Sequence, residues 1–196
     1  MEDFLVIDLE ATCYKRGTEP HGFLSEIIEI GAVMLDTGAR VPRWEGDWIV
    51  RPRLNPVVSP FCSELTTLTQ AEVDGGISLA QALDEMLARA GEGAWRFASW
   101  GFFDRGILED NCRRYGIPYR MPRHFSLKHE FALYYNRHPI GMAGALKTLR
   151  IPLQGTHHRG IDDARNIAAI AARMLEDGWT PRYVTAQEFH LLKRRR

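Results

Sequence analysis

Short apolar runs and amphipathic periods alternate along the chain. Runs of apolar, β-branched and aromatic residues predict strands at 4–7, 27–35, 48–50 and 95–100. Apolar residues at helical spacing predict helices near 79–87, 107–115, 131–135, 142–149 and 164–175. The strands cluster in the first half and the helices in the second, with helices also crossing between strands. This order predicts an α/β fold with a central mixed sheet flanked by helices.

Local signals mark where some elements begin and end. Thr69 stands three residues before Glu72, which is the pattern of a capping box at a helix start. Gly91 and Gly116 each follow a helical period and predict its end. Three prolines in residues 51–60 predict a loop.

Composition narrows the class of protein. The chain has 196 residues, 45% hydrophobic and 26% charged, which is typical of one globular domain and unlike a disordered or fibrous chain. Equal numbers of acidic and basic residues give a formal net charge of zero, which excludes a uniformly basic protein that coats nucleic acid. The charge is uneven, however: residues 1–36 hold eight acids against two bases, and residues 113–150 hold eight bases against one acid.

The cysteines and the absence of long apolar runs bear on location. Cys13, Cys62 and Cys112 are odd in number and widely spaced, so we expect reduced thiols and neither a disulfide framework nor a zinc site. The chain begins with acidic residues where a secretion signal would be basic. Its apolar runs are far shorter than the roughly 20 residues that a membrane-spanning helix needs. We therefore expect a cytoplasmic protein that is not bound to a membrane.

Two acids end the first predicted strand. Asp8 and Glu10 are two residues apart, so in an extended chain they project from the same face. Neighbouring carboxylates repel each other, and a divalent cation such as Mg²⁺ or Mn²⁺ would relieve that repulsion. The alternative is that the strand simply ends in solvent with two surface acids.

Further acids stand at two predicted helix starts. Asp104 follows the strand at 95–100, where an aspartate on its own is ordinarily a helix cap. At the start of the last helix, Asp162 is the natural N-cap, and Asp163 faces the core in the first turn. His158 lies on a glycine-containing loop from which it can reach the same place as Asp163.

Together these motifs resemble a known family. Asp8-x-Glu10, Asp104 and His158 with four residues before Asp163 are similar to the DEDDh family of 3′→5′ exonucleases. The surrounding segments 26–32, 61–66, 99–104 and 158–163 are most similar to its Eri1/3′hExo-type branch, which contains RNA-trimming enzymes. In this register His158 and not His157 takes the position of the base. Arg159 stands where the sister branch would require a tyrosine.

The resemblance implies a ribonuclease H-like fold and a mechanism. A single exonuclease domain would span residues 1–180, followed by an extension with a basic tail at 181–196. Two divalent cations, Mg²⁺ or Mn²⁺, would bind the four acids, and His158 would act as the general base. The enzyme would release nucleoside 5′-monophosphates from single-stranded 3′ ends, RNA more readily than DNA. By the same resemblance, the nucleotide-binding residues would be Leu9, Ala11, Thr12, Leu65 and Trp100.

Several alternatives stay open at this point. The same chemistry would serve a DNA-directed or proofreading-type exonuclease, and the fold would also serve a catalytically idle module that binds nucleic acid. The basic residues 113–150 and the tail 193–196 would either contact phosphates or face solvent. Selection of particular RNAs would rest on an accessory protein, and the oligomeric state is open.

Overall fold

The computed structural model describes residues 2–183 and builds them around one five-stranded sheet. The strand order is β3-β2-β1-β4-β5, with β1 antiparallel to β2 and parallel to β4. The strands are β1 (Asp3–Ala11), β2 (Ile27–Asp36), β3 (Val41–Ile49), β4 (Trp95–Ser99) and β5 (His124–Ser126). The predicted α/β class with a mixed central sheet is confirmed.

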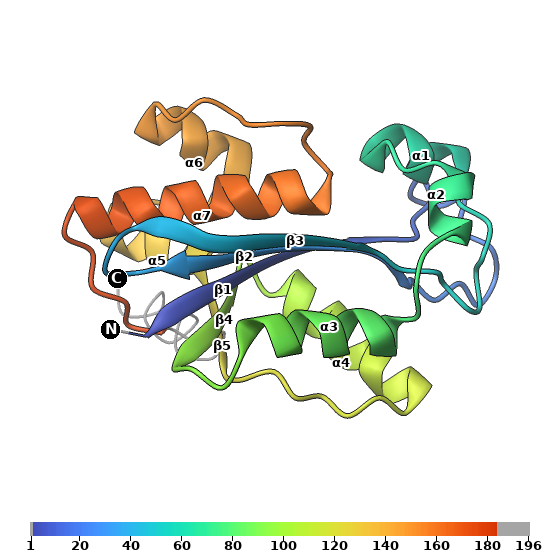
Figure 1. Ribbon diagram of the computed structural model, residues 1–196. Coiled ribbons are helices and arrows are strands. Elements are labelled where there is room, and N and C mark those ends of the chain that lie inside the picture. Colours follow the sequence, from blue (N-terminus) through green and yellow to red (C-terminus); the bar gives the residue numbers. More distant parts are fainter. Residues whose placement is uncertain (1, 184–196) are drawn as a thin grey trace.

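Helices cover both faces of the sheet, and two short ones stand at one end (Figure 1). On one face lie α5 (Leu127–Tyr134), α6 (Met142–Leu149) and α7 (Gly160–Glu176), and on the other α3 (Leu79–Ala90) and α4 (Phe103–Tyr115). The end helices are α1 (Pro60–Thr66) and α2 (Gln70–Asp74). Alternate β1 residues face the two cores, with Phe4 and Val6 toward α7 and Leu5 and Ile7 toward α3 and α4. This alternation decides which side the functional residues of β1 occupy.

Several local predictions hold, including the capping box of Thr69 and Glu72 at the start of α2. Gly91 and Gly116 are the C-cap residues of α3 and α4. The third strand is longer than predicted, because the exposed edge strand β3 begins at Val41 and lacks an apolar run. Sequence patterns also missed β5, which has three residues, and α1, which begins at Pro60, the last residue of the predicted loop.

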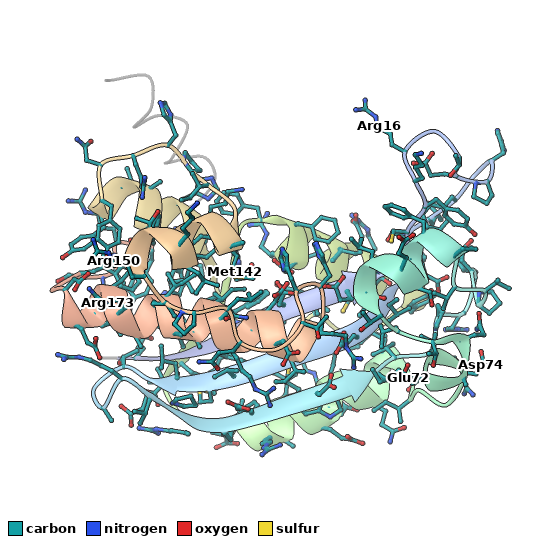
Figure 2. All side chains as sticks on the ribbon, turned by 90° about the horizontal axis from the view of Figure 1, so that it is seen from above. Arg16, Glu72, Asp74, Met142, Arg150 and Arg173 are labelled. Carbon is teal, nitrogen blue, oxygen red and sulfur yellow. The ribbon has the colours of Figure 1, made fainter. Side chains whose placement is uncertain are left out.

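The basic stretch at 113–150 does not form one surface. Its first arginines lie on α4, whereas Lys147 and Arg150 belong to α6 and its C-cap on the opposite face of the sheet. Two of its charges are paired with acids, Arg113 with Asp110 and Arg120 with Asp84. Figure 2 shows Arg150 and Arg173 at the far end of the molecule from Glu72 and Asp74. The basic residues therefore do not make a continuous track toward the acids.

Other expectations meet the structure only in part. All three cysteines are free, as predicted. None of the described helices is long and apolar enough to cross a bilayer. The basic tail at 193–196 lies outside the described residues, so the division into a domain at 1–180 and an extension stays a prediction. The cytoplasmic location likewise stays a prediction.

Two glycines bring α7 into backbone contact with the sheet. A Cβ added at Gly31 on β2 would lie 2.0 Å from the carbonyl carbon of Gly160, the first residue of α7. A Cβ at Gly160 would in turn lie 3.0 Å from the Gly31 nitrogen and 3.2 Å from the Asp8 oxygen. Only residues without a side chain permit this approach, so the glycines fix the depth of the α7 N-terminus.

We predict that Gly31→Ala separates α7 from the sheet and lowers the free energy of unfolding by about 3 kcal/mol or more. The matched control is Gly144→Ala within α6, where a Cβ would meet its nearest atom at 3.5 Å. Alanine there should stabilise the helix by up to about 1 kcal/mol. Urea unfolding followed by circular dichroism compares the two variants. Equal stability of Gly31→Ala and wild type would show that this contact is not a constraint.

Candidate active site

Asp8 and Glu10 point from β1 toward the N-terminus of α7. They continue the same alternation as Phe4 and Val6, so their side chains lie on the α7 face of the sheet. Asp8 and Glu10 thus share one face, as predicted. Glu10 is only 8% exposed, which argues against the alternative that the strand simply ends in solvent. Two carboxylates are held side by side at the edge of the core.

Asp163 joins them from the first turn of α7 and is 4% exposed. One carboxylate oxygen from each of Asp8, Glu10 and Asp163 lies within 4.8 Å of the others. The prediction that Asp163 faces inward is confirmed, but the prediction for Asp162 is wrong. Arg159 is the N-cap residue, and the Asp162 carboxylate instead accepts from the Thr156 amide at 2.8 Å. The helix begins three residues earlier than the aspartate pattern indicated.

Asp104 lies behind Asp8 and does not cap its helix. The N-cap residue of α4 is Phe102, and Asp104 sits in the first turn with 6% exposure. Its Oδ1 accepts a hydrogen bond from the Leu9 amide at 3.2 Å, across the β1–α4 contact. The ordinary capping interpretation is therefore wrong for Asp104, whose charge instead acts on Asp8.

Burial and neighbouring carboxylates disfavour the ionised forms of Asp8 and Glu10. Burial, followed by the charge of Asp104, raises the pKa of Asp8 well above its usual value. Burial also raises the pKa of Asp104, and it raises the pKa of Glu10 to about 9 with help from Glu29 and Asp163. Converging, desolvated oxygen donors are the ligand set that Mg²⁺ and Mn²⁺ favour. The residues present therefore fit divalent cations, whose charge would offset this repulsion.

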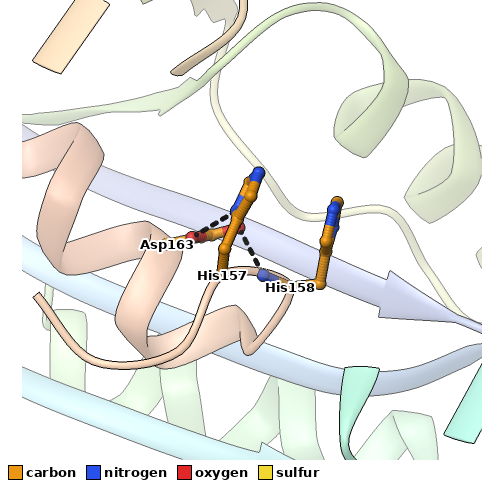
Figure 3. A group of neighbouring side chains, drawn as sticks. All are labelled: His157, His158 and Asp163. Atoms are coloured by element: carbon orange, nitrogen blue, oxygen red, sulfur yellow. Dashed lines mark hydrogen bonds and ion pairs between the residues drawn. The ribbon is translucent and has the colours of Figure 1, made fainter. Parts of the chain in front are cut away.

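Two adjacent histidines flank Asp163 (Figure 3). His157 Nδ1 lies 2.8 Å from Asp163 Oδ2, whereas His158 donates its backbone amide to the same oxygen at 3.1 Å. The two rings stack with centroids 4.0 Å apart. Within the described part of the chain the His158 imidazole makes no hydrogen bond, and burial lowers its pKa. His158 thus presents a neutral ring that is not held by a partner.

Glu29 and Arg159 belong to this neighbourhood, although sequence reasoning gave neither a role in it. Glu29 lies opposite Glu10 in the β1–β2 pairing and is fully buried. Its carboxylate accepts from the Gly160 amide at 2.9 Å and from Arg159 Nε at 3.2 Å. The available signal was an acid inside an otherwise apolar strand, since such a residue needs a partner.

Comparison with known proteins agrees with this geometry. The family model described as Exonuclease matches residues 5–171. The chain belongs to the exonuclease family. The nuclease domain of 3′hExo, a DEDDh family member solved with rAMP, superposes with a TM-score of 0.86 at 28% identity, covering 94% of this chain and 96% of that one. The resemblance to the DEDDh exonucleases and the ribonuclease H-like fold are both confirmed.

Curated relatives place the exonuclease in the Eri1 branch. It is 33% identical to mouse ERI1 exoribonuclease 2 over 89% of its own length and 28% of that protein's. It is 30% identical to the 3′-5′ exonuclease Snipper of Drosophila melanogaster, over 89% of this chain and 69% of the relative. The chain thus spans between 28% and 35% of the ERI1 exoribonuclease 2 proteins that it matches.

The five candidate nucleotide-binding residues of the exonuclease differ in exposure and in the direction of their side chains. Leu9 and Ala11 direct their side chains into the core on the α3 and α4 side, so only their backbone faces the carboxylates. Thr12 is 2% exposed, and its hydroxyl oxygen accepts from the Glu26 amide. Leu65 on α1 and Trp100 after β4 are partly exposed, and the indole of Trp100 donates to the Ile140 carbonyl. Side-chain contact with a base is therefore available from Leu65 and Trp100.

The raised pKa of Glu10 predicts that the stability of the metal-free protein depends on pH. The folded state holds this proton more tightly than the unfolded chain, so stability falls as pH rises from about 4.5 toward 9. In chelator, Glu10→Gln should raise the free energy of unfolding near pH 7.5 by an amount on the order of 2 kcal/mol and flatten the pH profile. Urea titrations across this range measure both effects.

Glu64→Gln is the control for that experiment, because Glu64 is exposed on α1 and should leave the profile unchanged. Mn²⁺ should stabilise the wild type more than Glu10→Gln, since binding to the folded state adds to stability. A wild-type profile that stays level in chelator would contradict the carboxylate repulsion.

Proposed function

We propose that the chain is a metal-dependent 3′→5′ exonuclease that hydrolyses phosphodiester bonds from the 3′ ends of single-stranded RNA. The observation that carries this proposal is the group of Asp8, Glu10 and Asp163, whose oxygens lie within 4.8 Å of one another, with Asp104 behind it. Membership of the exonuclease family supports the reaction class. The names of the exoribonuclease relatives support RNA over DNA.

Asp8, Glu10, Asp104 and Asp163 would hold two divalent cations, Mg²⁺ or Mn²⁺. When bound, the cations supply positive charge that acidifies the attacking water and offsets charge on the leaving 3′ oxygen. Buried carboxylates that repel one another give such cations a strong reason to bind. The chain's own part is to hold the four acids in place before the substrate arrives.

His158 would accept the proton of the attacking water. Its lowered pKa keeps the imidazole neutral at neutral pH, so the ring has a free lone pair. The water oxygen bonds to phosphorus, the bond from phosphorus to the 3′ oxygen breaks, and the products are a nucleoside 5′-monophosphate and a shortened strand. The Nδ1 of His157 lies 2.8 Å from Asp163 Oδ2, so that nitrogen is not the one that takes the proton.

Leu65 and Trp100 would receive the terminal base, because they are partly exposed and apolar or aromatic. Stacking of this kind suits unpaired ends and tolerates any base. Backbone groups of Leu9, Ala11 and Thr12 would border the terminal sugar. Selection of particular RNAs through an accessory protein stays a prediction, as does the oligomeric state.

The test is digestion of 5′-labelled single-stranded RNA with Mg²⁺ or Mn²⁺. Wild type should shorten the strand stepwise from its 3′ end, and a 3′-phosphate should stall it. Asp8→Asn and Asp163→Asn should lower the rate by about 10³-fold or more, because several kcal/mol of charge stabilisation is lost. His158→Asn should lower it by about 10²-fold to 10⁴-fold, the usual range for a general base.

Parallel digestion of DNA and of dinucleotides separates the alternatives. Faster cleavage of DNA would overturn the RNA assignment and leave the site intact. Binding of oligonucleotides with no metal-dependent turnover would instead identify an idle binding module. Full activity of Asp8→Asn would show that the reaction takes place elsewhere.

A further inference from the structure

A fifth buried acid lies beside the four proposed metal ligands and is already occupied. Glu29 faces Glu10 across the β1–β2 pair, yet both of its oxygens accept hydrogen bonds from the start of α7. Burial raises its pKa to about 7, against the opposing effects of the Gly160 amide and Arg159. Glu29 therefore holds the segment that follows His158 through these two hydrogen bonds, and its oxygens are not free for a cation.

The side chain of Arg159 contacts acids on three different elements. Its Nε lies 3.2 Å from Glu29 on β2, and its terminal nitrogens lie 4.0 Å from Asp47 on β3 and 3.9 Å from Glu72 on α2. The side chain is 22% exposed. A planar guanidinium suits this multiple contact in a way that an ammonium group does not. Glu72 lies on α2, which follows α1 and its Leu65 in the chain, so Arg159 also contacts one of the two end helices.

The backbone conformation of His158 depends on the contacts of the residues on both sides of it. His158 has φ of +68°, a left-handed conformation that costs a non-glycine residue roughly 1–2 kcal/mol. Such a conformation persists only when its flanks are fixed. On one side the Thr156 amide is bonded to Asp162, and on the other the Arg159 side chain is bonded to Glu29. The contact of Arg159 with Glu29 is therefore one of those that fix the flanks of His158.

We propose that Arg159, held by Glu29, is a positioning residue that fixes His158 against the carboxylate site. The proposal rests on the function proposed above, because it gives His158 the role of base. Arg159 acts through its neighbour and need not touch the substrate. Its loss should therefore slow the chemical step while the cation ligands stay in place.

A double-mutant cycle measures this dependence. Arg159→Gln should lower kcat by about tenfold to a hundredfold, in line with the cost of misplacing a reacting group by 1 Å. Its KM and its calorimetric affinity for Mn²⁺ should change by less than about twofold. In a His158→Asn background, the same substitution should lower kcat by less than about twofold, because the residue that it positions is gone.

Hydrogen exchange gives a readout that does not need turnover. Arg159→Gln should speed exchange of the His158 amide, which the native loop holds on Asp163. Glu45→Gln is the matched control, because it removes the 2.7 Å contact of Arg165, another α7–β3 ion pair, without touching Arg159. It should leave both the exchange of that amide and kcat unchanged.

The outcomes are distinguishable. Unchanged exchange at His158 in Arg159→Gln overturns the positioning proposal, whether or not the enzyme turns over. An equal loss of kcat in the wild-type and His158→Asn backgrounds also overturns it, since the role would then be structural. A wild type that digests no nucleic acid would overturn the proposed function instead. Arg159→Lys, which keeps the charge, should recover only part of kcat because it cannot bridge three acids.

Discussion

The contact between Gly31 and Gly160 is the constraint on which the site depends. It presses the first residue of α7 against β1 and β2 at a distance that no side chain would permit. Asp163 follows three residues later in the first turn, so its depth is set by the same contact. Asp8 and Glu10 approach from the strand below. A separation of the helix by even one methyl group would move the third carboxylate away from the other two.

This packing gathers charges that the fold itself does not favour. Burial raises the pKa values of Asp8, Glu10 and Asp104, and neighbouring carboxylates raise those of Asp8 and Glu10 further, so the folded metal-free protein carries an electrostatic cost. The rest of the chain offsets that cost through its two apolar cores. Function and stability are therefore opposed at this point, as is common at active sites. The neutral net charge of the sequence conceals this concentration of acids.

Sequence patterns predicted most of the fold and the inward direction of Asp163, because those depend on local periodicity. They could not predict β3 from Val41 or the three-residue β5, whose pairing is decided by neighbouring strands. They also misjudged Asp162 and Asp104, since the first accepts from the Thr156 amide of the preceding loop and the second from the Leu9 amide, far away in the chain. The contacts of Glu29 with α7 span about 130 residues of chain, so an acid in an apolar strand signals the need for a partner but not which partner it finds.

The two histidines show why spacing and geometry must be combined. The register of the family resemblance pointed to His158, yet the ring that bonds Asp163 in the structure belongs to His157. The two facts agree if the bonded ring and the free ring have different tasks. The Nδ1 of His157 is occupied by the Asp163 carboxylate, whereas the His158 ring makes no hydrogen bond among the described residues. The left-handed backbone of His158 places its ring in a stack with that of His157. The strained backbone of this one residue therefore orients the ring to which the proposed mechanism assigns the proton transfer.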